Sequence, residues 1–207
     1  LRAIRKPLPA FNGRHLPIAS LKFSATPREQ RAAALKTLLA LLPAASGVRL
    51  ALQILGAAFD PRGLRIRGFP AANEQRLALL HGLMHLLPPT ARQYLTFSTF
   101  APRVPANVPR IVFSEAAEAA GRRTLDWPSA TLDEDAPSEG YAAHIRLRSG
   151  DDAEILLATL RDLDIGGFRL EAGQTAAEAL AALANRHMRD LALLAGETLN
   201  VSELLAA

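Results

Sequence analysis

The sequence predicts an α/β fold, in which a small, mostly parallel sheet flanked by helices is followed by a C-terminal helical part. A strand, a helix and a second strand follow one another over residues 64–100, an order that favours a right-handed crossover and a parallel pair. The chain has 207 residues, 49% of them apolar, which is enough to bury a core. We therefore expect an extended lead-in over residues 1–15, an α/β domain over 16–130 and a helical part over 137–207 packed on it.

Two helices and an edge strand are expected before the main strands. Residues 18–24 alternate as an edge strand does. Residues 26–29, Thr-Pro-Arg-Glu, contain a capping threonine, a first-turn proline and a capping-box glutamate, and predict a helix that runs to about Leu42. Residues 46–59 fit both strand alternation and helical spacing, and we favour a helix because their length and alanines suit one.

Four strands and one helix make up the expected sheet region. The strands are predicted at residues 64–69, 94–100, 110–114 and 123–127. The second, Tyr-Leu-Thr-Phe-Ser-Thr-Phe, is the clearest because aromatic and β-branched residues favour strands. Between the first two strands, Asn73 can cap a helix over residues 74–87 that ends at two prolines.

The remainder of the chain is expected to be helical. An acidic, turn-rich linker is predicted over residues 131–138. Helical stretches then follow at residues 138–148, 151–163, 174–194 and 198–206, with glycines between them.

Charge is divided unequally along the chain. Residues 1–114 carry 16 Lys or Arg against three acids, a balance of +13, and residues 115–207 carry 8 Arg against 17 acids, a balance of −9. This division indicates that the halves face each other or that one half meets a partner of opposite charge. We expect carboxylates of the second half within ion-pair distance of some members of a set of basic side chains. The set is Arg65, Arg67, Arg76, Arg92 and Arg103.

The composition narrows the classes of protein to consider. Without cysteine, the chain has no disulfide, thiolate metal site or cysteine nucleophile. No apolar run reaches the roughly 18 to 20 residues of a membrane span, so we expect a cytoplasmic protein that makes no membrane contact. The excess of Arg over Lys, with much Ala and Leu, is typical of a GC-rich bacterial genome, and the start at Leu1 favours a segment of a larger protein. No cofactor is expected.

His81 and His85 lie four residues apart on one predicted helix and could face the same metal ion. The sequence His-Gly-Leu-Met-His lacks the glutamate of a zincin, and the surrounding leucines make this helix apolar nearly all round. We therefore expect both histidines to be structural, packed against apolar neighbours, and to bind no metal.

Residues 68–74 join a strand to a helix, which is where phosphate-binding loops lie. The Gly-Lys-Ser or Gly-Lys-Thr groups that such a loop needs are absent from the whole sequence, so nucleotide hydrolysis is not expected. An anion-binding alternative nevertheless stays open, with candidates around this turn and after the helix. They are Arg65, Arg67, Arg76 and Arg92.

Other reactive side chains have simpler explanations. The hydroxyl groups of residues 96–99 lie in a predicted strand, and no adjacent base or glycine-flanked elbow points to a serine nucleophile. The acidic run 133–135 is expected to be solvated, and residues 151–152 to favour a helix N-terminus. Trp127 is expected to be a packing anchor.

One part of the sequence resembles a known family. Residues 79–89, Leu-Leu-His-Gly-Leu-Met-His-Leu-Leu-Pro-Pro, are followed by Ala91-Arg92 and by Leu-Thr-Phe-Ser-Thr at residues 95–99. A helix that ends in Leu-Pro-Pro, then an arginine and a Leu-(Ser/Thr)-Phe-Ser-Thr strand, resembles the middle domain of the bacterial GTPase-associated proteins, large proteins of GTPase-centred conflict systems. The resemblance extends over about residues 16–165 in the order of elements. It implies a non-enzymatic adaptor segment within a multidomain assembly and supplies no catalytic residues.

The favoured function is a non-enzymatic protein-interaction or scaffold module that binds an unidentified protein partner. The alternative is a nucleotide- or nucleic-acid-binding domain that uses the basic first half. A third hypothesis is a hydrolase whose site is assembled from residues distant in sequence.

Overall fold

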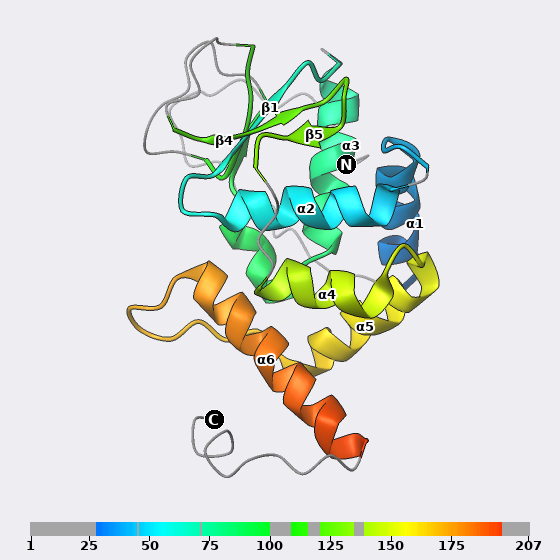
Figure 1. The fold of residues 1–207 in the computed structure, drawn as a ribbon, viewed down its shortest axis with the longest axis vertical. Coiled ribbons are helices and arrows are strands. Elements are labelled where there is room, and N and C mark those ends of the chain that lie inside the picture. The colour runs from blue at the N-terminus through cyan, green and yellow to red at the C-terminus, as the bar shows by residue number, and fades with distance from the viewer. Residues whose placement is uncertain are drawn as a thin grey trace, which may run out of the picture.

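A five-stranded sheet at one end of the molecule and three helices at the other are separated by a layer of helices (Figure 1). The computed structural model describes residues 28–44, 46–70, 72–99, 109–115, 121–134 and 139–195. The predicted lead-in, the edge strand at 18–24, the capping Thr26 and the helix at 198–206 lie outside these residues.

The bounds of the elements follow the sequence patterns closely in the helices. The helices are α1 (Arg28–Ala40), α2 (Gly47–Phe59), α3 (Asn73–His85), the 3-10 helix η2 (Pro89–Tyr94), α4 (Tyr141–Ser149), α5 (Ala153–Gly166) and α6 (Ala176–Leu194). The strands are β1 (Leu64–Arg67), β2 (Phe97–Ser98), β3 (Ile111–Phe113), β4 (Arg123–Asp126) and β5 (Thr131–Leu132). None of these helices has the combination of length and hydropathy that a membrane span requires.

The α/β class is confirmed. The strand order is β2-β3-β1-β4-β5, and every neighbouring pair is parallel except β4 and β5. The strands at the two ends of the 64–100 segment, β1 and β2, run in the same direction but are not neighbours, because β3 lies between them. The reason is burial: all three residues of β3 are buried, and a strand covered on both faces belongs inside a parallel sheet.

Two sheet predictions are wrong in part. The predicted strand 94–100 is reduced to the two residues of β2, because the second proline of the Pro-Pro pair starts η2, which continues to Tyr94. The Tyr94 ring packs 5.8 Å from that of Phe168, so tertiary packing overrides β-propensity here. The predicted linker at 131–138 begins with β5, which pairs with β4 through the turn at residues 127–130.

The ambiguity over residues 46–59 is decided in favour of a helix. α2 is buried nearly all round, since the strand β1 lies on one side and α4 on another (Figure 1). Only Arg49, Gln53 and Gly56, which recur at helical spacing on one face, are not buried. At α3 the predicted cap is displaced: Asn73 is the first helical residue, and the cap position is Ala72, whose side chain cannot accept a hydrogen bond.

Helices α1 and α3 approach most closely at Gly82. A Cβ atom placed on Gly82 would overlap the Cβ atom of Leu38, which is fully buried. The sequence therefore needs glycine here although glycine weakens a helix interior.

We expect Gly82→Ala to lower the free energy of unfolding by about 1 to 3 kcal/mol, because overlap with Leu38 outweighs the roughly 1 kcal/mol gained in helix propensity. Urea unfolding followed by circular dichroism would measure it. Gln75→Ala, an exposed change on the same helix, is the control and should change stability little. Equal or greater stability of the Gly82 variant would contradict the close packing.

Candidate functional site

The carboxyl ends of parallel strands are the usual ligand-binding edge of an α/β sheet, and here protein side chains fill it. Gly68 follows β1 with a φ of 70°, and its N–H donates to Glu115 Oε1 at 2.9 Å. A carboxylate of the chain itself thus accepts the bond that a bound anion would accept at this turn.

The candidate arginines at this edge, Arg67 and Arg76, donate hydrogen bonds to other groups of the protein. Arg67 Nη2 lies 2.7 Å from Asp126 Oδ1, so the expected ion pair across the two halves is confirmed for this residue. Arg76 donates to the carbonyl oxygens of Pro70 and Thr99, and its guanidinium lies 5.3 Å from the centre of the Phe113 ring.

The other candidates lie elsewhere. Arg65 is buried, and burial together with the nearby Arg67 lowers the pKa of its guanidinium. Arg92 is on η2 and donates to the carbonyl of Leu87 at 3.4 Å. Arg103 is outside the described residues. The four arginines of the anion-binding alternative are therefore not gathered in one cavity, and binding of an anion by them stays a prediction.

The two histidines of α3 have different environments. His85 is 4% exposed, and burial, followed by Arg92, His81 and Arg31, lowers its pKa to about 4. His81 is exposed, which corrects the expectation that both are packed away, although the two rings are in edge contact at 4.7 Å. Among the described residues no cluster of three or more His, Asp or Glu side chains could hold a metal ion. The absence of a metal stays a prediction.

A second histidine pair was not predicted. His144 Nε2 on α4 and His187 Nδ1 on α6 are 2.8 Å apart, so one ring donates a hydrogen bond to the other. Burial, then His187 and Arg148, lowers the pKa of His144 to about 4. No sequence pattern indicates this pair, since 43 residues separate its members.

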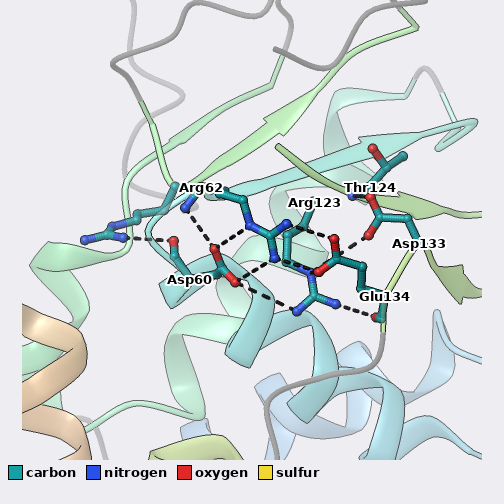
Figure 2. A network of polar contacts seen from close by, with 7 residues as sticks. Asp60, Arg62, Arg123, Thr124, Asp133 and Glu134 are labelled. Carbon is teal, nitrogen blue, oxygen red and sulfur yellow. Dashed lines mark hydrogen bonds and ion pairs between the residues drawn. The ribbon is translucent and has the colours of Figure 1, made fainter. Parts of the chain in front are cut away.

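Asp133 and Glu134 are exposed, as expected of solvated acids, and they also form ion pairs that the sequence did not indicate, whereas Asp135 lies outside the described residues. Figure 2 shows Asp133 and Glu134 in a network with Arg62 and Arg123. Glu134 accepts two hydrogen bonds from Arg62, at 2.8 and 2.7 Å, and Asp133 accepts one from the N–H of Thr124 at 2.8 Å. The network lies at the amino ends of β1 and β4, away from the edge formed by the carboxyl ends of the parallel strands.

Three smaller predictions have clear outcomes. Asp152 caps α5 by accepting from two backbone N–H groups, as expected for a helix N-terminus. Trp127 packs against Phe69, with ring centres 4.3 Å apart, which confirms a packing role. The Thr96 hydroxyl accepts from the backbone N–H of Arg110 at 3.0 Å.

The end of α3 is where the sheet layer meets the C-terminal helices. Tyr141 on α4 donates its hydroxyl to the carbonyl of Leu86 at 2.9 Å. Arg31 on α1 donates to Asp164 on α5 at 2.7 and 3.2 Å, and to the carbonyl of Leu87 at 3.4 Å. Carbonyls that a helix end leaves without partners are therefore bonded by side chains of two other helices.

A cavity of about 510 Å³ opens beside this ion pair. Its wall is formed by α1, η2 and α5. The lining residues are Arg31, Pro89, Arg92, Glu154, Leu157, Ala158, Arg161 and Asp164. Sequence reasoning singled out only Arg92 among these. One weak sequence pattern could have indicated the others: Glu154, Ala158 and Arg161 recur at helical spacing along one face of α5.

Exposed apolar side chains are concentrated on the helical part. Of the eight large apolar residues exposed in the described chain, only Phe97 precedes α4. The others are Leu147, Ile155, Ile165, Leu170, Met188, Leu193 and Leu194. All of them except Leu170, which follows α5, are on α4, α5 or α6, and exposed apolar surface is one feature of faces that contact other proteins.

No protein-family model, characterised protein or solved structure matches this chain. The resemblance of residues 79–99 to the bacterial GTPase-associated proteins therefore stays a prediction from the sequence.

Asp164→Asn should lower the free energy of unfolding by about 2 to 3 kcal/mol, because Arg31, only 8% exposed, would keep its charge without the carboxylate. Chemical unfolding in a double-mutant cycle with Arg31→Gln would measure the coupling. The control is Asp162→Asn, which breaks the exposed pair with Arg161 and should cost about 0.5 kcal/mol or less. Additive effects of the Arg31 and Asp164 changes would contradict the role of the pair.

Stability should fall as the pH is lowered from about 6.5 to about 4. The unfolded chain binds protons at His85 and His144 in this range, whereas the folded chain, with both pKa values near 4, does not. Each histidine contributes at most about 1.4 kcal/mol per pH unit. Urea unfolding at several pH values would show the slope.

The matched pair of variants for this test is His85→Leu and His81→Leu. The first should reduce the change of the unfolding free energy with pH by the contribution of one histidine. The second should reduce it less, because His81 is exposed, although partial burial lowers its pKa as well. An unchanged slope in His85→Leu would show that this side chain is not the source.

Proposed function

We propose that the chain is a non-enzymatic protein-interaction or scaffold module that contacts its partner through α4–α6. The observation that carries this proposal is the concentration of exposed apolar side chains on these helices. Leu194 is 84% exposed and Leu147 82%, so a partner that covered them would remove much apolar surface from water.

The proposal is strongest at α6. Ala176, Leu180 and Leu183 are buried on one face of this helix. Beyond His187, which hydrogen-bonds His144 on α4, Leu191 and Leu194 continue the same face by steps of three or four residues. No residue of α6 after Ala184 is buried among those described. Figure 1 shows this end of α6 projecting beyond α4 and α5. An apolar face that runs past its own core is suited to packing against an amphipathic helix of another protein.

The proposal also concerns the larger protein to which the module belongs and its location. We infer a cytoplasmic adaptor segment of a larger bacterial protein, in keeping with the resemblance of residues 79–99 to the GTPase-associated proteins. That string and the exposed apolar side chains of α4–α6 support this setting.

The test is affinity capture with the chain and with a Leu147→Glu, Leu194→Glu variant, followed by identification and titration of any stoichiometric protein. We expect the variant to lose the partner while keeping its thermal stability, because both leucines are exposed in the free chain. Thr90→Glu with Gln75→Glu is the matched control, since it adds the same charge at exposed sites outside α4–α6. Equal binding by both variants, or no binding by the unaltered chain, would rule the proposal out.

A further inference from the structure

We propose that the cavity between α1, η2 and α5 binds a small molecule that carries a phosphate group. Helix α5 contributes to both this cavity and the surface proposed for protein contact, but the two proposals rest on different side chains. It brings together side chains that are far apart in the sequence, with Arg31 and Asp164 separated by 133 residues.

The charge of the lining selects an anion. Three guanidinium groups, those of Arg31, Arg92 and Arg161, face the cavity from three different elements. Two carboxylates oppose them, and one of these, Asp164, is held by the two hydrogen bonds from Arg31. With three arginines against two carboxylates, the lining has an excess of positive charge, and arginine is the cation whose donor geometry suits oxyanions.

Phosphate fits this arrangement better than carboxylate. Arginines on three different elements line the cavity, and a phosphate monoester, with three strong acceptor oxygens and close to two negative charges at pH 7, can be approached from several sides. A carboxylate has two oxygens in one plane and one charge.

Burial strengthens the attraction at the inner end of the site. Arg31 is 8% exposed and Arg92 is half-buried, whereas the Arg161 side chain is 62% exposed at the rim. Burial, and after it the charge of Arg31, lowers the pKa of Arg92. An anion that relieves this repulsion in a partly desolvated place is bound more strongly than one on an open surface.

The size of the cavity implies an organic body beside the phosphate. A volume of about 510 Å³ is in the range of small-molecule sites, roughly 300 to 1,000 Å³, and is much larger than a phosphate ion. Pro89, Leu157 and Ala158 provide an apolar wall for that body. A bound ligand would connect η2 to α5, so it should also stabilise the contact between the sheet layer and the C-terminal helices.

The experiment is calorimetric titration with glycerol 3-phosphate, inorganic phosphate, glycerol and succinate at constant ionic strength, with melting temperatures measured in parallel. We expect saturable binding of the two phosphate compounds, tighter for glycerol 3-phosphate, and a rise in melting temperature. Glycerol should not bind measurably. Succinate that binds as tightly as glycerol 3-phosphate would overturn the assignment to phosphate.

Three variants test the place of binding. Arg161→Gln removes a rim donor and should weaken binding about tenfold or more, the loss expected for one charge-assisted hydrogen bond. Ala158→Phe changes no charge but fills the cavity, and should abolish binding of glycerol 3-phosphate. Arg169→Gln is the matched control, because Arg169 is exposed and does not line the cavity. An equal loss in Arg169→Gln, unchanged binding in Ala158→Phe, or no saturable binding of either phosphate compound would overturn the proposal.

Discussion

The carboxyl end of α3 is the constraint on which the arrangement of the two layers depends. A helix end leaves carbonyl groups without partners, and burying them unbonded is costly. Here Tyr141 bonds the carbonyl of Leu86, and Arg31 bonds that of Leu87 while it holds Asp164. One guanidinium therefore links α1, the end of α3 and α5. The same contacts fix the distance between α5 and η2, which leaves the cavity open.

The opposite charges of the two halves of the chain form ion pairs within the fold. In the described part of the chain, ion pairs that join the basic first half to the acidic second half include Arg31 with Asp164, Arg62 with Glu134, and Arg67 with Asp126. The last two are exposed pairs, which contribute little stability each: Arg67 and Asp126 are cross-strand neighbours on β1 and β4, and Arg62 joins the turn before β1 to the segment after β5. A basic isoelectric point therefore does not by itself imply an open basic face.

Helix α5 connects the two proposed surfaces. Leu156, Leu160 and Leu163 put one of its faces into the core, and the opposite face lines the cavity. Ile165 follows Arg161 by one turn on that second face and is exposed. The amphipathic pattern of α5 therefore reflects its two faces: one packs in the core, and the other forms a charged, partly apolar surface.

The sequence by itself determined the features that depend on near neighbours: the extents of α1, α2 and the C-terminal helices, the strands β1, β3 and β4, and the cap at Asp152. These follow from prolines, capping groups and periodicity within a few residues. Only the tertiary structure decided the short strands β2 and β5, the placing of β3 between β1 and β2, and the site of Arg31, Arg92 and Arg161. Each of these depends on contacts between segments far apart in the chain, and the pattern of one segment carries no information about which distant segment will pack against it.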